Sequence, residues 1–274
     1  MLRKFTAIII VAFLLAFSHS AIASIAFPQR IVSGIPSVTE ILYGIGIQDR
    51  VVGVSSTDNF PPEVKKKERI GGLTLNIEKI IALDPDLVIL HETAQKLEIP
   101  KLRRFNVPIY TVDPRSVGDI IYSIMEIGRI TGENVNAANL ISAMYERIEA
   151  AKARVKDKPK KKVFVLVGYK PIVSVGKDSF INSIIEYAGG INMLAESQNP
   201  YPQLSFEQFL YMNPPHIIVL KNLISESEVK SDLRWRQISA LKNGKILFID
   251  EDILVRPGPR VVYAIEKIAE FLHE

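Results

Sequence analysis

Hydrophobic and polar residues along this chain follow two alternating patterns. Short runs rich in β-branched residues alternate with longer segments in which apolar residues recur at helical spacing. Strands separated by helices in this way are typical of a mostly parallel sheet with helices on its faces. The runs that we predict as strands are residues 31–33, 51–54, 87–90, 109–112, 163–167, 217–220 and 246–249.

Capping residues predict where several of the helices begin. Ser37, followed by Glu40 three residues later, predicts a capping box. Asp178 is predicted to cap a helix over residues 179–188, which ends at two consecutive glycines. A closing helix is predicted after the segment Pro257-Gly258-Pro259.

One phrase of the sequence occurs twice. Residues 76–90 read NIEKIIALDPDLVIL, and residues 205–220 read SFEQFLYMNPPHIIVL. Each copy begins with a helix-capping residue and passes through a proline-containing turn into a β-branched strand. Glu78 and Glu207 occupy matching positions in the two copies. The repeat divides the chain into two similar α/β halves, which suggests a ligand cleft between two matched lobes.

A long helix without glycine or proline is predicted between the halves. Apolar residues recur at helical spacing over residues 136–155, which at 1.5 Å per residue make a rod of about 30 Å. We therefore predict an α/β fold of two Rossmann-like lobes with parallel sheets, joined by one long rigid helix. The predicted boundaries are 24–132 for the first lobe, 133–157 for the linking helix and 158–274 for the second lobe. A rigid link predicts that the lobes move little when ligand binds.

Residues 1–23 have the form of a cleavable secretory signal peptide. Arg3 and Lys4 precede an apolar stretch of 12 residues, which is too short to span a bilayer, and a small-x-small cleavage site follows. An uncleaved anchor is the alternative. Without Arg3 and Lys4 the net charge falls from +4 to +2, too little to indicate nucleic acid or an anionic membrane as a partner. We therefore expect an exported, periplasmic protein.

The residues able to carry chemistry do not form the motifs of common enzymes. The chain has no cysteine, which excludes disulfides and thiolate nucleophiles. His91, His216 and His273 form neither an HxH nor an HExxH pair, and no G-x-S-x-G motif is present. We therefore expect no catalytic residues, no cofactor and no metal site. An exported enzyme that uses the cleft is the rival hypothesis, although no nucleophile–base pair supports it.

Several motifs together resemble one family of transport proteins. They are Pro36-Ser37-Val38-Thr39-Glu40, the segment 76–90, Pro200-Tyr201-Pro202-Gln203 and Arg256-Pro257-Gly258-Pro259-Arg260. This set, within a resemblance that covers nearly all of residues 29–274, is similar to the periplasmic substrate-binding proteins of ABC importers for cobalamin, iron–siderophore and haem. The resemblance implies the class III fold of these proteins, a chelate bound between the lobes, and delivery by a monomer to a permease–ATPase complex.

The likeness is greatest to the cobalamin-binding members of that family. In those proteins one glutamate on each lobe pairs with arginines of the permease, and the matching positions here are Glu78 and Glu207. The alternative is that each glutamate only stabilises its own helix, worth about 0.3–1 kcal/mol. We therefore expect cobalamin or a related corrinoid as the ligand. A ferric siderophore is the alternative within the family, and a scaffold or sensor that has kept the fold is a third possibility.

The ligand pocket resembles the cobalamin binders less well than the rest of the chain does. Of the aromatic positions that line their cleft, only Tyr201 keeps an aromatic residue here, and Phe60 and Tyr169 could compensate. His91 directly follows a predicted strand, so it should emerge at the edge of the cleft. Arg115 and Arg256 are at loop positions suited to an anionic siderophore. Haem is disfavoured because residues 71–73, where haem binders carry a tyrosine ligand, read Gly-Gly-Leu.

Overall fold

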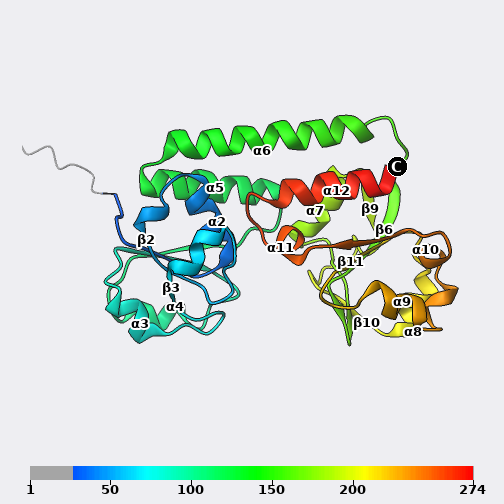
Figure 1. Ribbon diagram of the computed structural model, residues 1–274, viewed down its shortest axis with the longest axis horizontal. Coiled ribbons are helices and arrows are strands. Elements are labelled where there is room, and N and C mark those ends of the chain that lie inside the picture. The colour runs from blue at the N-terminus through cyan, green and yellow to red at the C-terminus, as the bar shows by residue number, and fades with distance from the viewer. Residues whose placement is uncertain (1–26, 274) are drawn as a thin grey trace, which may run out of the picture.

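Two α/β lobes lie side by side, and one long helix runs along both of them (Figure 1). The structure is a computed structural model that describes residues 27–273. The predicted α/β class, with two lobes of parallel sheet and a long linking helix, is confirmed. The predicted signal peptide, residues 1–23, lies outside the described residues. Between residues 27 and 273, no helix is both long enough and apolar enough to cross a membrane.

The first lobe is built on a five-stranded sheet in which every neighbouring pair is parallel. Its order is β3-β2-β1-β4-β5, so the strands that open the chain lie at its centre. Three of the predicted strands match their predicted bounds, and β4 is one residue longer because it includes His91. The strands are β1 (Ile31–Ser33), β2 (Val51–Val54), β3 (Glu68–Arg69), β4 (Leu87–His91) and β5 (Ile109–Val112).

Helices cover both faces of this sheet. The longest of them in this lobe, α5, begins at the Ser116 cap and ends at Gly132, whose φ of +79° suits glycine. Short 3-10 turns at Gln48–Arg50 and Pro62–Lys66 complete the lobe. The helices are α2 (Pro36–Gly44), α3 (Ile77–Ala82), α4 (Ile99–Arg103) and α5 (Val117–Thr131).

The second lobe repeats this plan with four parallel strands in the order β12-β11-β6-β9. A small antiparallel sheet, in the order β10-β8-β7, is added to it. The strands are β6 (Lys161–Leu166), β7 (Gly168–Tyr169), β8 (Ile172–Val173), β9 (Gly190–Asn192), β10 (Gln203–Leu204), β11 (Ile217–Leu220) and β12 (Ile246–Ile249). The helices are α7 (Phe180–Tyr187), α8 (Phe206–Met212), α9 (Glu226–Ser231), α10 (Ser239–Lys242), α11 (Glu251–Leu254) and α12 (Val261–His273), with a 3-10 turn at Trp235–Gln237.

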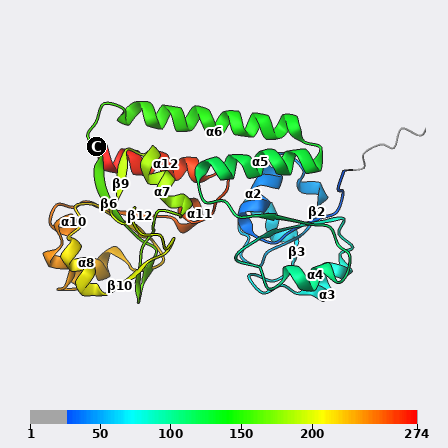
Figure 2. The ribbon, with the colours of Figure 1, turned by 180° about the vertical axis from the view of Figure 1, so that it is seen from behind.

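The linking helix α6 (Asn134–Val155) joins the lobes through a shared apolar core. Its buried face contacts α5 of the first lobe and α12 of the second (Figure 2). Met144 and Ile148 belong to the same core cluster as Ile124 of α5 and Ile265 of α12. Because this core is continuous, an independent swing of the lobes would expose apolar surface. The fold therefore favours small lobe movements.

The two copies of the sequence repeat have the same local structure. Asn76 caps α3 by accepting a hydrogen bond from the backbone N–H of Lys79 at 2.9 Å, and Ser205 caps α8 in a capping box with Gln208. Each helix is followed by a residue with a left-handed backbone, at Asp84 with a φ of +46° and at Asn213 with a φ of +42°. The internal duplication inferred from sequence therefore extends to both ends of the repeated helix.

Two predicted helix caps are wrong. Helix α2 begins at Pro36, whose fixed φ suits the first helical turn, so Ser37 lies inside the helix and makes no capping bond. Glu40 is not part of a capping box and forms ion pairs with the second lobe instead. Helix α7 is capped by Ser179, one residue later than predicted, which leaves Asp178 free of the helix end.

Candidate functional site

The candidate ligand site is a cleft between the two lobes. Its volume is about 530 Å³, which suits a small molecule or one face of a larger chelate. On the first lobe its walls come from loops that follow the carboxyl ends of β1, β4 and β5, where ligands of open α/β sheets bind. The lining residues are Ile35, Pro36, Ser37, Leu73, His91, Thr93, Ala94, Asp113, Pro114, Arg115, Asp178, Ser179, Phe180, Gln198, Pro200, Tyr201, Val255, Arg256 and Pro257.

A cluster of polar side chains around Asp113 forms the wall contributed by the first lobe. Asp113 lies at the end of β5 and accepts a hydrogen bond from the Thr93 hydroxyl at 2.7 Å. The Arg115 guanidinium pairs with the same carboxylate at 3.3 Å, and the Nε2 atom of His91 lies 3.6 Å from it. Two donors, the Thr93 hydroxyl and the Arg115 guanidinium, therefore bind one carboxylate, and the His91 ring lies beside it.

Both ring nitrogens of His91 lie close to other groups of the protein. The backbone N–H of Ala94 donates to Nδ1 at 3.3 Å, which places the imidazole proton on Nε2, facing Asp113. Burial lowers the pKa of His91, and the nearby charges of Asp113 and Glu92 only partly oppose that effect. His91 is therefore neutral at pH 7 and is held in one orientation. A metal ion could bind it only by displacing one of these contacts.

Gln95 positions the polar wall and was not found from the sequence. Its side chain is buried, accepts from the backbone N–H of His91 at 2.9 Å, and donates to the carbonyls of Gly34 and Gly72. One amide thus ties the ends of β1 and β4 to the Gly72 loop. Nothing in the sequence marks this glutamine, because its partners come from three separate segments.

The second lobe contributes a mainly apolar wall. Phe180, Pro200, Tyr201 and Val255 line it, and Asp178 adds one carboxylate. Tyr201 is 44% exposed, and its backbone is fixed by a hydrogen bond from its N–H to the Asn199 side chain at 3.0 Å. The cleft therefore places an accessible aromatic ring opposite the polar wall.

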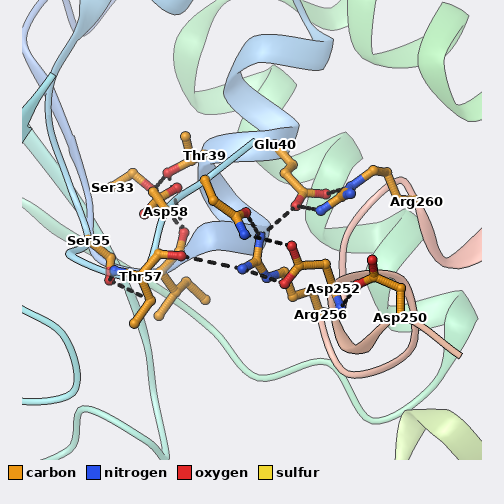
Figure 3. A network of polar contacts seen from close by, with 12 residues as sticks. Ser33, Thr39, Glu40, Ser55, Thr57, Asp58, Asp250, Asp252, Arg256 and Arg260 are labelled. Carbon is orange, nitrogen blue, oxygen red and sulfur yellow. Dashed lines mark hydrogen bonds and ion pairs between the residues drawn. The ribbon is translucent and has the colours of Figure 1, made fainter. Parts of the chain in front are cut away.

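Arg256 lines the cleft, but its guanidinium faces a polar network between the lobes (Figure 3). It pairs with Asp252 at 2.7 Å and with Glu40 of the first lobe at 3.4 Å. It also donates to the side chain of Asn59 at 2.7 Å. The sequence suggested a ligand contact for Arg256, whereas the structure shows a cation whose charge is already paired.

Phe60 and Tyr169 do not line the cleft. Phe60 packs beneath the Arg260 guanidinium, whose central carbon lies 4.1 Å from the ring centroid. Tyr169 packs against Trp235, with ring centroids 6.2 Å apart, and its hydroxyl donates to Asp232 at 3.3 Å. Of the six predicted ligand contacts, the structure thus brings together Tyr201, His91, Arg115 and Arg256.

Glu78 and Glu207 are exposed and lie outside the cleft. They are in the first turns of α3 and α8, on the side of the molecule opposite α6 (Figure 1). Neither forms an ion pair with another residue between 27 and 273. The pKa of Glu207 is lowered by its own backbone N–H and by the Ser205 hydroxyl, which keeps this carboxylate ionised. The repeat therefore places one exposed carboxylate on each lobe, and both carboxylates lie on the same face of the molecule.

Comparison with known proteins decides the family. Residues 31–253 match the family described as periplasmic binding protein. The chain belongs to this family. Two relatives cover almost the whole chain. An uncharacterized ABC transporter substrate-binding lipoprotein of Bacillus subtilis, YvrC, is 34% identical over 90% of this chain and 80% of its own length. A vitamin B12-binding protein of Vibrio vulnificus is 31% identical over 88% of this chain and 89% of its own length.

Solved structures with this fold belong to proteins that are described as binding different ligands. A possible iron-binding (periplasmic solute-binding) protein from Staphylococcus epidermidis superposes with a TM-score of 0.80 at 29% identity, over 91% of this chain and 100% of its own. The periplasmic heme-binding protein RhuT from Roseiflexus gives a TM-score of 0.80 at 26% identity, over 89% of this chain and 98% of its own. The chain is thus a solute-binding protein of an ABC transporter and not an enzyme, and proteins of this kind work with a permease and an ATPase.

Proposed function

We propose that this protein captures cobalamin or a related corrinoid in the interlobe cleft and delivers it to its permease. The observation that carries the proposal is the pairing of charge in the cleft. Arg115 is neutralised by Asp113, and Arg256 by Asp252 and Glu40. A corrinoid bears many neutral amide groups and needs hydrogen-bonding partners more than it needs free cations. Asp113, Thr93 and Gln198 supply such partners.

The shape of the cleft supports a ligand with a large flat face. Tyr201 and Leu73 lie on opposite lobes, are 44% and 69% exposed, and offer apolar surface at the cleft rim. A macrocycle too large for the cleft volume would rest on both of them. His91 would then contact the ligand by packing and not as a ligand to cobalt, because Nδ1 accepts from Ala94 and Nε2 faces Asp113.

A ferric siderophore is the second candidate, and the exposure of Arg115 favours it. The side chain of Arg115 is 65% exposed, and its contact with Asp113 is 3.3 Å long. Exposed pairs of this kind contribute about 0–1 kcal/mol, so an anionic chelate could draw the guanidinium away from Asp113.

Calorimetric titration of the chain without residues 1–23 tests this proposal. We expect 1:1 binding of cyanocobalamin and no binding of a ferric hydroxamate siderophore or of haem under the same conditions. Binding of the siderophore alone would favour the second candidate, in which Arg115 contacts an anionic chelate. Binding of haem alone would contradict both candidates.

We expect replacement of Tyr201 by alanine to weaken cyanocobalamin binding. Buried aromatic contacts at a binding site contribute about 1–3 kcal/mol each, which corresponds to a loss of affinity of roughly 5- to 150-fold. The matched control is Tyr122→Ala, because Tyr122 is 58% exposed and lies outside the cleft. Equal affinities of the Tyr201→Ala and Tyr122→Ala variants would show that Tyr201 does not contribute to ligand binding.

The proposed docking face carries Glu78 and Glu207. Two carboxylates on two lobes that share a core fit a pair of cationic sites on a two-fold permease. Tyr211 lies one helical turn after Glu207 and is 93% exposed, so it adds an aromatic side chain of the kind enriched at protein interfaces. The matching residue of the first repeat is Ala82, so the two ends of the face differ.

The proposed location rests on the predicted signal peptide and on the family. We propose export to the periplasm or an equivalent space by residues 1–23, and action there as a monomer. The similar Bacillus protein is described as a lipoprotein. This chain has no cysteine to carry a lipid, which supports release as a free protein.

A further inference from the structure

A buried carboxylate of the first lobe is held by two arginines of the second. Glu40 lies on α2 and is 4% exposed. Arg260 binds it with two parallel hydrogen bonds, from Nε at 2.9 Å and from Nη2 at 2.5 Å, and Arg256 adds a third contact at 3.4 Å. Bidentate arginine–carboxylate pairs combine strength with a fixed geometry. This contact therefore constrains the orientation of the lobes as well as their separation.

Arg256 extends the contact into a network that crosses the interface several times. Its two terminal nitrogens donate to Glu40, to the Asn59 side chain at 2.7 Å and to the carbonyl of Thr57 at 3.3 Å, and they pair with Asp252 at 2.7 Å. The Asn59 amide in turn donates to Asp252 at 2.7 Å. Figure 3 shows Glu40 and Thr57 of the first lobe and Asp252 of the second around the Arg256 guanidinium. We name the set of Glu40, Asn59, Asp252, Arg256 and Arg260 the interlobe latch.

The backbones of the two lobes touch beside the interlobe latch. A Cβ atom added to Gly258 would lie 3.4 Å from the Cα and carbonyl oxygen of Ser37 and 3.5 Å from a carboxylate oxygen of Glu40. Ser37, Arg256 and Pro257 also line the cleft. The latch and part of the cleft lining are therefore built from the same short segments, so a shift in one moves the other.

We propose that Glu40 is a positioning residue that sets the dimensions of the ligand cleft by holding Arg256 and Arg260 across the lobe interface. In this arrangement Arg256 lines the cleft while its charge stays paired with Glu40 and Asp252. The latch acts together with the core around α6: the core limits large swings, and the latch selects one lobe angle among those that the core permits.

Distance measurement between the lobes tests the proposal without reference to any ligand. The chain has no cysteine, so spin labels can be attached at Leu97→Cys and Leu233→Cys, which lie on different lobes and are 72% and 66% exposed. We expect a narrow distance distribution in the parent and a broader one in Glu40→Gln, which keeps the side-chain shape and removes the charge. Arg260→Lys keeps the charge, loses the bidentate geometry and should give an intermediate width.

The matched control is Glu126→Gln, which breaks the Arg129–Glu126 pair within α5 of the first lobe and should leave the distribution unchanged. Circular dichroism checks that each variant is folded, and if Glu40→Gln does not fold, Arg260→Lys carries the test. An unchanged distribution in a folded latch variant would overturn the proposal.

Affinity for cyanocobalamin is the second readout, and it rests on the proposed function. If the variant holds the cleft geometry about one-tenth of the time, the apparent affinity falls about tenfold. A broader distribution with no loss of affinity would show that the latch sets the lobe angle without setting the cleft, and would overturn the positioning role. If the parent itself does not bind cyanocobalamin, the proposed ligand fails, and the distance measurement still decides whether the latch fixes the lobes.

Discussion

Reversing the charge of both proposed docking residues, Glu78→Lys together with Glu207→Lys, should abolish uptake of the ligand and leave its affinity for the protein unchanged. Both side chains are exposed, outside the cleft, on the face opposite α6. If the permease meets them with cations, the variant places like charges together at two points, at a cost of several kcal/mol. Transport into cells or proteoliposomes that contain the cognate permease and ATPase measures uptake, and calorimetry measures affinity.

A control with the same change of charge separates docking from a general electrostatic effect. Glu146 on α6 and Glu270 on α12 are also exposed and lie on helices remote from the proposed docking face. The double variant Glu146→Lys with Glu270→Lys should transport like the parent. Normal uptake by the Glu78/Glu207 variant would contradict the docking role, and a matching loss of ligand affinity would place the effect in the cleft.

Local patterns in the sequence were sufficient for most of the fold. The β-branched runs at β1, β2, β5, β11 and β12 have the predicted bounds because each is a short apolar segment enclosed by turn residues. The long helix was found because its apolar period is unbroken by glycine or proline. The small sheet of β7, β8 and β10 was not predicted, since two-residue strands depend on partners distant in sequence. The cap of α7 was misplaced by one residue because Asp178 and Ser179 are both good caps.

The candidate site could be predicted only where topology alone determines position. His91 ends β4 and Arg115 follows β5, and residues at these carboxyl ends of a parallel sheet meet at one edge. Tyr201 is held at the cleft by its proline-rich loop. The pairing of Glu40 with Arg256 joins residues 216 positions apart, so no local pattern indicates it. Phe60 and Tyr169 were chosen for their aromatic character, and packing against Arg260 and Trp235 takes them elsewhere.

A buried aspartate beside the latch should make the protein less stable as the pH rises from about 4 to about 6. Asp58 is 4% exposed, and neither oxygen of its carboxylate has a hydrogen-bond partner in the described part of the chain. Burial raises its pKa from 3.8 to about 6, although Thr39, Arg256 and Arg69 favour the charged form. The charge of Asp58 also contributes to the raised pKa of the Tyr43 hydroxyl on α2, after the larger effect of burial.

The direction of the pH effect follows from the raised pKa. Between its ordinary value and about 6, Asp58 is protonated in the folded state and ionised in the unfolded state, so the folded state binds the extra proton. The free energy of unfolding therefore decreases as the pH rises through this window and levels off above it. Each pKa unit corresponds to about 1.4 kcal/mol, so the loss amounts to about 3 kcal/mol.

Replacement of Asp58 by asparagine should remove this loss, because the amide has a similar shape and does not ionise. We expect Asp58→Asn to match the parent near pH 4 and to exceed its free energy of unfolding by up to about 3 kcal/mol at pH 7.5. Urea unfolding at pH 4, 5, 6 and 7.5 measures the difference, with Asp49→Asn as the control because Asp49 is exposed. Parallel curves for Asp58→Asn and the parent across this range would show that Asp58 keeps an ordinary pKa in the folded protein. A difference in the free energy of unfolding between Asp58→Asn and the parent that grows from pH 4 to pH 6 would show that the protein retains a buried carboxylate next to the interlobe latch at a cost in stability.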